Sequence, residues 1–221
     1  MKSIQINASS GSIENKSLQP SKIVCIGRNY VEHIHELANE IPDEMVVFLK
    51  PNSSISTQLE AVHLNDVLHY EAELCFLYEN GRFTAVAIGL DLTKREVQAK
   101  LKSKGLPWER AKAFDGSAVF SSFINIEHLS ETEFQQLNLL LNINGEVIQQ
   151  GGVDLMMYKP DVILQELQRF MTLEDGDIVM TGTPKGVGVI QPGAEFVGQV
   201  FLNDTSNLEK QLIVKEKWIV N

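Results

Sequence analysis

The chain has 221 residues, a formal net charge of −10 at pH 7, a sequence pI near 5.0, 43% hydrophobic residues and 22% charged residues. This length and composition fit one globular domain with a substantial core. The acidic balance argues against a nucleic acid or an anionic membrane as partner. The chain has no apolar run of about 18 residues, so we expect no transmembrane helix.

The N-terminal segment, residues 1–20, is polar and rich in Ser and Asn, and it predicts a short strand at Ile4–Ile6 followed by a loop. It has neither the apolar core of a signal peptide nor the arginine-rich character of a transit peptide, so we expect a cytoplasmic protein. Residues 21–221 are expected to form a single domain. Cys25 and Cys75 lie in apolar runs, which favours buried thiols over a disulfide or a metal site.

The first apolar segment, Lys22–Gly27, predicts a strand that leads into a short helix. Asn29 is a favourable N-cap, and Glu32, three residues later, completes the pattern of a capping box. In such a helix His33 and Glu36 stand at i and i+3, on one face.

A further strand, Met45–Pro51, is followed by one that carries Glu71 and Glu73 and ends at the Asn80-Gly81 turn. Residues i and i+2 of a strand share a face, so the two carboxylates lie side by side. Their repulsion suits either a solvated strand face or a bound hard cation such as Mg²⁺, which prefers carboxylate oxygens.

The next run, Thr84–Leu90, is almost continuously apolar, predicts a buried strand and ends on Asp91. Thr93 and Glu96 form a second capping-box pattern, which predicts a helix that ends before Gly105. If the strand returns beside the glutamate strand, Asp91 reaches the same place as the glutamate pair.

The rest of the chain predicts a hairpin around Asn144-Gly145, a helix and three further strands. The predicted segments are Leu137–Ile143, Glu146–Gln150, a helix within Tyr158–Met171, and strands at Asp177–Met180, Glu195–Leu202 and Leu208–Val220. Many strands with few helices indicate an α+β domain dominated by β structure.

Six motifs, taken together and in this order, resemble the fumarylacetoacetate hydrolase family, most closely its single-domain acylpyruvate hydrolase and oxaloacetate decarboxylase branch. They are Gly27-Arg28-Asn29-Tyr30-x-x-His33-x-x-Glu36, Phe48-Leu49-Lys50-Pro51, His69-Tyr70-Glu71-x-Glu73, Leu90-Asp91-Leu92-Thr93-x-Arg95-x-x-Gln98, Gly105-Leu106-Pro107-Trp108-x-x-x-Lys112-x-Phe114 and Gly176-Asp177-x-x-x-Thr181-Gly182-Thr183-Pro184-x-Gly186-Val187-Gly188. The similarity covers nearly everything from about residue 22 onward.

The resemblance implies a β-rich roll of mixed sheets with few short helices, a catalytic domain over residues 21–221, and a homodimer. It also implies Mg²⁺ or Mn²⁺ as cofactor and a small anionic keto acid as substrate. The residues it implies are Glu71, Glu73 and Asp91 as metal ligands, His33, Glu36 and Lys112 as catalytic groups, and Arg95, Gln98 and Thr183 as substrate contacts. One departure is that only 17 residues separate Glu73 from Asp91, fewer than the family usually has.

Three functions follow as hypotheses. The first is a Mg²⁺-dependent hydrolase that cleaves a C–C bond in acylpyruvates such as acetylpyruvate or fumarylpyruvate, with His33 as general base. Glu36 would hold the His33 tautomer or relay its proton, and Lys112 would donate to an oxyanion or fix the substrate carboxylate. The second is an oxaloacetate decarboxylase or keto–enol tautomerase that uses the same site. The third is a catalytically silent metal-binding protein. His35, beside His33, is the alternative candidate for the base.

Overall fold

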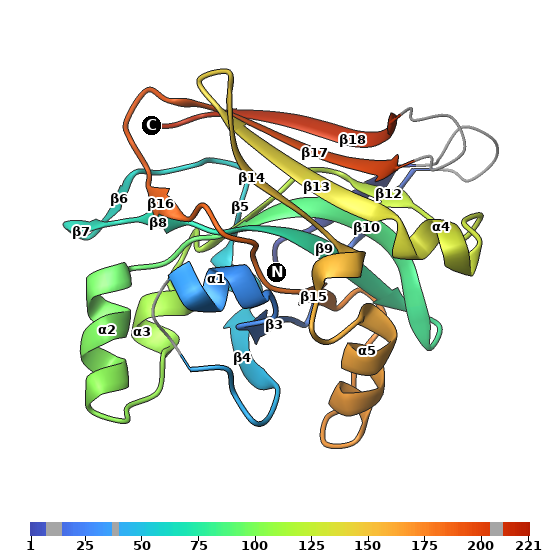
Figure 1. Cartoon of the computed structure of the whole chain (residues 1–221), viewed down its shortest axis with the longest axis horizontal. Helices are drawn as coiled ribbons and strands as arrows, with labels where there is room; N and C mark the ends of the chain where they lie inside the picture. The colour runs from blue at the N-terminus through green and yellow to red at the C-terminus, as the bar shows by residue number, and fades with distance from the viewer. Residues whose placement is uncertain (8–14, 37–39, 204–209) are drawn as a thin grey trace.

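The computed structural model describes residues 1–7, 15–36, 40–203 and 210–221. Strands dominate these residues, and two large curled sheets lie one above the other, with short helices at the edges and on the lower side (Figure 1). The predicted α+β, β-rich roll of mixed sheets is therefore confirmed.

The larger sheet runs through the middle of the molecule, in the order β2-β1-β12-β10-β9-β15-β3-β4, with β11 and β5 added beside β10. Its strands are β1 (Ile4–Asn7), β2 (Lys16–Leu18), β3 (Lys22–Gly27), β4 (Val46–Pro51), β5 (Ile55–Ser56), β9 (Ala72–Glu79), β10 (Arg82–Asp91), β11 (Ala118–Phe120), β12 (Phe123–Asn125) and β15 (Ile178–Met180). Parallel and antiparallel pairs both occur, because β15 is parallel to β3 and antiparallel to β9.

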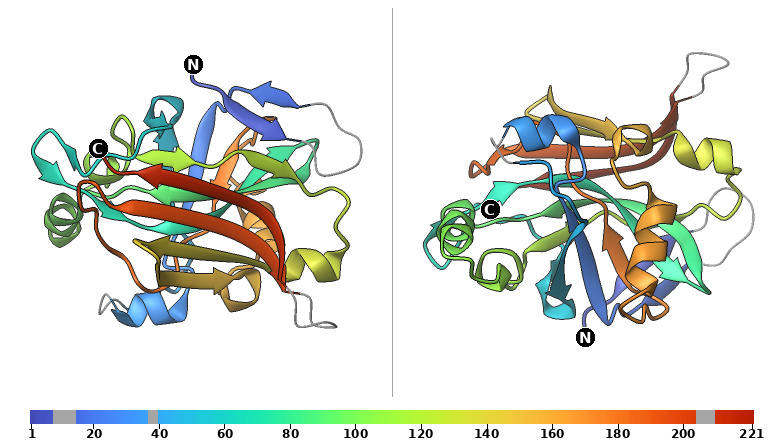
Figure 2. Two further views of the ribbon diagram at one scale, coloured as in Figure 1. Left: turned by 90° about the horizontal axis from the view of Figure 1, so that it is seen from above. Right: turned by 60° about the horizontal axis from the view of Figure 1, so that its bottom comes forward.

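The second sheet is antiparallel, in the order β14-β13-β17-β18, and it covers the upper face of the larger sheet (Figure 2, left). Its strands are β13 (Leu137–Ile143), β14 (Glu146–Gly152), β17 (Glu195–Asn203) and β18 (Lys210–Ile219). Phe76 and Ile88 of the larger sheet share one buried cluster with Leu139, Val200 and Trp218 of the second sheet. Burial of this apolar surface between the sheets is the main stabilising contribution.

Strand β9 divides its side chains between two cores. Leu74 and Phe76 enter the core between the sheets, whereas Cys75 and Leu77 enter a second core on the opposite face. This is the alternation of a strand buried on both faces. Glu73, two residues before Cys75, therefore belongs to the second face, away from the upper sheet.

Helices occupy the lower side and the ends of the sheets. They are α1 (Val31–Glu36), α2 (Arg95–Ser103), α3 (Glu109–Lys112), α4 (Glu131–Gln135) and α5 (Pro160–Gln168). The remaining described strands form two two-stranded sheets: β6 (Val62–His63) pairs with β7 (Asp66–Val67), and β8 (His69–Tyr70) pairs with β16 (Gly188–Val189). Ile163 and Leu167 of α5 pack on Val24 and Val179. None of the described helices has the length and apolar character needed to span a bilayer.

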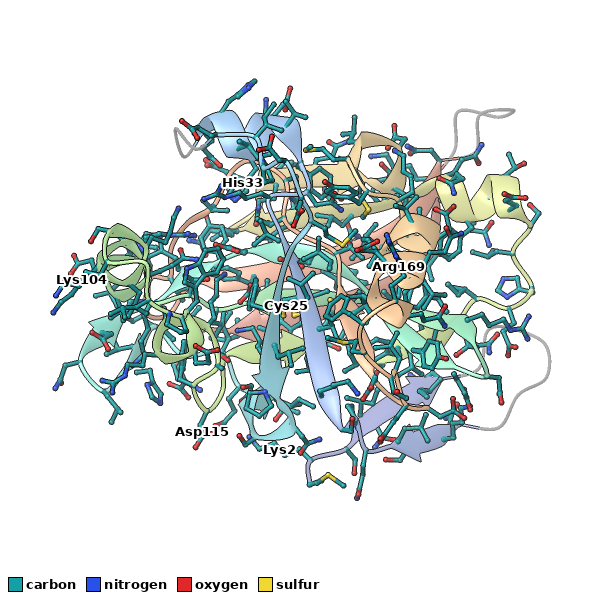
Figure 3. The ribbon with its side chains drawn as sticks, turned by 90° about the horizontal axis from the view of Figure 1, so that it is seen from below. Lys2, Cys25, His33, Lys104, Asp115 and Arg169 are labelled. Atoms are coloured by element: carbon teal, nitrogen blue, oxygen red, sulfur yellow. The ribbon has the colours of Figure 1, made fainter. Side chains whose placement is uncertain are left out.

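The predicted hairpins and the buried cysteines are confirmed. Asn80 and Asn144 have positive φ angles of 52° and 51°, each followed by a glycine, as a tight hairpin turn requires. Cys25 and Cys75 are both free and buried, and burial raises the pKa of each thiol. Figure 3 shows Cys25 near the middle of the lower face.

Both predicted capping boxes are wrong. The helix predicted after Asn29 begins at Val31, and the Asn29 side chain instead binds Tyr158: it accepts from the Tyr158 amide at 2.7 Å and donates to the Tyr158 carbonyl at 2.9 Å. Helix α2 begins at Arg95 without a side-chain cap. The Thr93 hydroxyl donates to the Asp91 carbonyl at 3.2 Å. The same hydroxyl accepts from Lys112 Nζ at 2.6 Å, so in each case a tertiary partner uses the group that would have capped the helix.

The N-terminal segment contributes to the larger sheet. β1 contains the predicted strand Ile4–Ile6 and pairs in parallel with β12, while β2, which the sequence did not predict, pairs with β1. The intervening predicted loop, residues 8–14, and the first two residues of the predicted strand Leu208–Val220 lie outside the described residues.

The start of β3 is tied to the start of β15 by one buried carboxylate. Asp177 Oδ1 accepts from the Ser21 amide, the Ser21 hydroxyl and the Lys22 amide at 2.7–3.1 Å, and Oδ2 accepts from Lys22 Nζ at 2.5 Å and from the Glu174 amide at 2.9 Å. Burial alone would raise the pKa of Asp177, but these hydrogen bonds outweigh it and hold the pKa below its usual value.

We predict that Asp177→Asn lowers the free energy of unfolding by roughly 1–3 kcal/mol at pH 7, because the hydrogen bonds to the charge are lost. Since the folded-state pKa is depressed, this stabilisation is complete above the unfolded pKa of about 3.9 and disappears as pH falls below it. Urea unfolding at pH 7 and pH 3 measures the difference. Glu166→Gln, which removes an exposed ion pair with Arg169, is the control and should change stability by less than about 0.5 kcal/mol. An equal cost at both pH values would contradict the account.

Candidate active site

The register between β9 and β10 brings three acidic side chains together. Glu73 pairs with Gly89, and the Asp91 amide donates to the Glu71 carbonyl at 2.8 Å, so Asp91 lies opposite Glu71. Since the three residues share one face of the sheet, their carboxylate oxygens lie within 4.8 Å of one another. All three are buried, with 6%, 2% and 1% exposure for Glu71, Glu73 and Asp91.

A buried ammonium bridges two of these carboxylates. Lys112, at the end of α3, is 2% exposed and lies 2.9 Å from Glu71 Oε2, 2.7 Å from Asp91 Oδ2 and 2.6 Å from the Thr93 hydroxyl. Burial lowers the pKa of Lys112, but the negative charges of Asp91 and Glu71 more than reverse this and raise the pKa above its usual value. The side chain therefore stays an ammonium at neutral pH.

A second buried lysine, Lys50, was missed as a site residue. Its side chain is fully buried in β4, its Nζ lies 2.8 Å from Asp91 Oδ1, and it donates to the Lys112 carbonyl. A lysine inside an apolar strand is rarely buried unless it is paired. That signal, present in the run Met45–Pro51, could have identified it.

Arg95 and Gln98, predicted as substrate contacts, lie one turn apart on α2 and face the cluster. The Arg95 guanidinium donates to Gln98 Oε1 at 2.8 Å and forms an ion pair with Glu71 Oε1. Burial raises the pKa of Glu71, but the charges of Lys112, Arg95 and His33 overcome it and leave the pKa below its usual value. Glu71 is thus a stable carboxylate.

Glu73 is different, because no lysine or arginine in the described chain pairs with it. Burial, together with the charges of Asp91 and Glu71, raises the pKa of Glu73 well above its usual value. Its Oε2 accepts only a backbone hydrogen bond, from the Gly182 amide at 2.7 Å. Gly182 needs to be glycine, because it has a φ of +96° and an added Cβ would lie 2.9 Å from the Asn29 Cβ.

Thr183, the third predicted substrate contact, lines the pocket, but its hydroxyl is bonded to the protein. It donates to the Ala72 carbonyl at 2.8 Å and accepts from Gln149 Nε2 at 2.8 Å. Gln149 also accepts from the Ala72 amide at 3.0 Å. Gln149, which the sequence did not indicate, therefore holds this loop against the strand that carries the glutamates.

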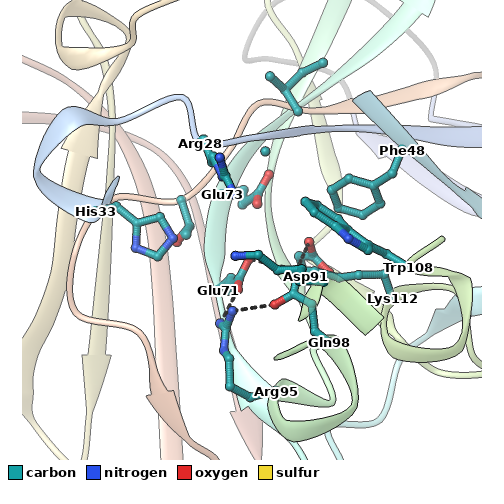
Figure 4. A pocket seen from close by; sticks show the side chains of 14 residues that line it. Arg28, His33, Phe48, Glu71, Glu73, Asp91, Arg95, Gln98, Trp108 and Lys112 are labelled. Carbon is teal, nitrogen blue, oxygen red and sulfur yellow. Dashed lines mark hydrogen bonds and ion pairs between the residues drawn. The ribbon is translucent and has the colours of Figure 1, made fainter. Parts of the chain in front are cut away.

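His33 and Glu36 form the predicted pair on α1. His33 Nδ1 lies 3.1 Å from one oxygen of Glu36, and the other oxygen accepts from the Gly186 amide at 2.9 Å. The His33 ring lies to one side of Glu71 (Figure 4). Glu36 is not among the residues that line the pocket. Because a carboxylate only accepts, the pair places a proton on Nδ1 of the neutral imidazole and leaves Nε2 as an acceptor.

These groups surround a pocket of about 50 Å³ (Figure 4). A cavity of this size holds a few water-sized spheres, which suits an ion or the polar end of a compact ligand. Phe48 and Trp108 form an apolar wall, with ring centroids 5.8 Å apart. Arg28 and Lys102 also line the pocket, and the sequence analysis assigned neither of them a role.

The donor set fits a divalent cation. Three buried carboxylates with oxygens within 4.8 Å are the ligands that Mg²⁺ and Mn²⁺ prefer. Glu73 lacks a cationic partner, and Asp91 Oδ1 accepts no hydrogen bond among the described residues although the Lys50 ammonium is 2.8 Å away. An ion bound here would share Glu71 and Asp91 with Lys112.

Comparison with known proteins identifies the family of this chain. The sequence pattern of the family described as "Fumarylacetoacetate (FAA) hydrolase C-terminal" matches residues 22–213. The chain belongs to the fumarylacetoacetate hydrolase family. It is 37% identical to oxaloacetate tautomerase YcgM of Escherichia coli over 79% of this chain and 86% of that protein. It is 38% identical to the mitochondrial oxaloacetate tautomerase FAHD1 of Bos taurus, over 78% and 84% of the two chains.

Solved structures of the family have the same fold. A protein from Oleispira antarctica aligns over 100% of both chains with a TM-score of 0.87 and 32% identity. Fumarylpyruvate hydrolase from Pseudomonas aeruginosa, in complex with Mn²⁺ and pyruvate, aligns over 99% of this chain and 95% of that one, with a TM-score of 0.80 and 26% identity.

We predict opposite effects on stability for two variants that both weaken metal binding. Glu73→Gln should raise the free energy of unfolding in EDTA at pH 7 by roughly 1–3 kcal/mol, because it removes a buried, unpaired charge. The folded-state pKa of Glu73 is raised, so this gain is absent below the unfolded pKa of about 4.3 and grows as pH rises. Asp91→Asn should be destabilising, because two buried ammonium groups lose a charged partner.

Urea unfolding in EDTA and calorimetric titration with Mn²⁺ test both statements. Each variant should bind Mn²⁺ at least about 100-fold more weakly than the wild type, since each loses an anionic ligand. Glu79→Gln, at the far end of β9, is the control and should bind the ion normally. Unchanged affinity in either site variant would refute the assignment of ligands.

Proposed function

We propose that this protein is a divalent-cation-dependent oxaloacetate keto–enol tautomerase. The observation that supports it most directly is the His33 imidazole, oriented by Glu36, which opens onto a pocket that holds three buried carboxylates and the Lys112 ammonium. Such a site pairs a general base with groups that stabilise negative charge on oxygen. The names of the relatives from Escherichia coli and Bos taurus favour oxaloacetate as the substrate.

The acidic cluster is the place for the ion, for which we propose Mg²⁺, with Mn²⁺ as an alternative. When bound to Glu71, Glu73 and Asp91, the ion would supply positive charge that polarises the keto group of the substrate. The remaining steps depend on side chains of this chain.

His33 is proposed as the base that removes a proton from C3 of oxaloacetate. With Nδ1 held by Glu36 at 3.1 Å, Nε2 accepts this proton. The C3–H electron pair becomes the C2–C3 double bond, the C2–O π pair moves onto oxygen, and that oxygen takes up a proton to give the enol. The exchange needs no other reactant, so protons and electrons balance.

Lys112 is proposed to stabilise the charge that develops on the C2 oxygen. Its ammonium is already held by Glu71, Asp91 and the Thr93 hydroxyl, so little reorganisation accompanies the reaction. Arg95, which Gln98 and Glu71 fix in place, is proposed to contact the substrate carboxylate next to the keto group.

We predict that His33→Gln lowers kcat for oxaloacetate tautomerisation by roughly 10²–10⁴-fold, the usual loss when a general base is removed. Its affinity for Mn²⁺ should stay within about threefold of the wild type, because His33 is not among the carboxylate ligands. His35→Gln, on the exposed face of the same helix, is the matched control and should retain activity. The enol absorbance of oxaloacetate follows the rate, and full activity in His33→Gln would rule out this role.

Acylpyruvate hydrolysis is the second candidate function. It is favoured by the likeness to the fumarylpyruvate hydrolase and by the His33–Glu36 pair, which suits activation of a water as well as removal of a C–H proton. Decarboxylation of oxaloacetate would use the same charge stabilisation without an attacking water.

The rival functions are separated by assaying one preparation on several substrates. We predict that kcat/KM for oxaloacetate tautomerisation exceeds that for acetylpyruvate hydrolysis and for oxaloacetate decarboxylation by at least about 100-fold, a difference of roughly 3 kcal/mol in transition-state stabilisation. Product analysis by NMR distinguishes enol, acetate and pyruvate. Faster acetylpyruvate cleavage would make hydrolysis the main function, and metal binding without turnover of any substrate would indicate a silent protein.

A further inference from the structure

Arg28 stands at the corner between β3 and α1 in an unusual backbone conformation. Its φ is +57°, in the left-handed region that residues other than Gly, Asn and Asp seldom occupy. Its side chain lines the active-site pocket, and in Figure 4 it lies on the side of the carboxylates away from Arg95. Strained residues of this kind cluster at functional sites.

Lys50, Lys112 and Arg95 are already paired with acidic groups. Lys50 and Lys112 contact Asp91, and Lys112 and Arg95 contact Glu71. Arg28 has no carboxylate partner in the described part of the chain, and its guanidinium makes one long hydrogen bond, 3.4 Å, to the Glu40 carbonyl. Its donors are therefore available to an anion that enters the pocket.

The neighbourhood of Arg28 is electropositive. Lys102, on α2, lines the same pocket, and burial together with the charges of Arg28 and Arg95 lowers the pKa of Lys102. Like charges that face one space are relieved by an anion placed between them. This part of the pocket thus has the chemistry of a carboxylate subsite, separate from the acidic cluster.

We propose that Arg28 binds the far carboxylate of a four-carbon oxo-dicarboxylate and so determines the preference for dicarboxylates over monocarboxylates. This inference deepens the proposed function and rests on it for the orientation of the substrate, whose keto-acid end lies at the acidic cluster. A guanidinium suits this role because its planar donors match the two oxygens of a carboxylate. Arg28 acts in binding, not in proton transfer.

The test uses two stable ligands that differ only at the far end. L-Malate and (S)-2-hydroxybutanoate have the same 2-hydroxy-acid head, but malate ends in a carboxylate where the other ends in a methyl group. Calorimetric titration of the Mn²⁺-loaded protein gives a dissociation constant for each ligand, and their ratio measures recognition of the far carboxylate alone.

The main variant is Arg28→Asn, because asparagine tolerates a positive φ and the corner should fold without added strain. We predict that it weakens malate binding by between about 10- and 150-fold, the range for a lost hydrogen bond to a charged group. Binding of 2-hydroxybutanoate and of Mn²⁺ should change by less than about twofold, since neither involves Arg28. Arg28→Lys keeps the positive charge but lacks the planar pair of donors, so its affinity for malate should lie between those of the wild type and of Arg28→Asn.

Arg169→Asn, which removes an exposed arginine on the C-terminal side of α5, is the matched control and should bind both ligands normally. The inference is overturned if Arg28→Asn weakens both ligands equally, if it weakens neither, or if the wild type does not prefer malate. Tautomerase activity of the wild type is measured in parallel. If Arg28→Asn loses the malate preference but the wild type shows no tautomerase activity, the subsite is supported and the proposed function is refuted. If the wild type is an active tautomerase but Arg28→Asn keeps the malate preference, the proposed function stands and the subsite is refuted.

Discussion

The structure depends on one electrostatic constraint: two adjacent strands place three carboxylates on the same buried face, where they would repel one another. Lys112 and Lys50 offset this repulsion for Asp91, and Lys112 and Arg95 do so for Glu71. Among the described residues, the Glu73 carboxylate has a single hydrogen-bond partner, the Gly182 amide. A cluster with incomplete compensation favours an additional cation. The three carboxylates stay close together despite their repulsion, because apolar side chains of β9 are buried in a core on each face of the sheet and fix its position.

The same constraint explains how the site is assembled from distant parts of the chain. Glu73 lies in β9, Glu71 directly precedes that strand, where the predicted continuous strand is interrupted, and Asp91 ends β10. Helix α3 supplies the bridging ammonium, α2 supplies Arg95, and α1 supplies His33. The loop after β15 closes the arrangement, since Gly182 binds Glu73 and Gly186 binds Glu36. These two backbone amides hold the Glu73 and Glu36 carboxylates in place. The pocket is thus preorganised for negative charge that develops on a substrate oxygen.

Sequence patterns anticipated the fold class, the hairpins and the pairing of Glu71 with Glu73, because strand alternation and turn chemistry are local properties. The place of Asp91 beside this pair was implied by the family resemblance. They did not anticipate what depends on long-range contacts. Asn29 and Thr93 were predicted as helix caps, but Asn29 binds the backbone of Tyr158 and the Thr93 hydroxyl accepts from Lys112. Lys50 and Gln149 were predicted only as strand residues, because the partners that give each its place at the site lie far away in sequence. The left-handed backbone of Arg28 likewise has no local signal.

The measurement that tests the central claim most directly is anomalous X-ray scattering from crystals grown with Mn²⁺. The account predicts one strong peak within bonding distance, about 2.0–2.3 Å, of carboxylate oxygens from Glu71, Glu73 and Asp91, with Lys112 still beside the cluster. A crystal at saturating Mn²⁺ with no peak there, and with the Lys112 ammonium alone joining Glu71 to Asp91, would contradict it.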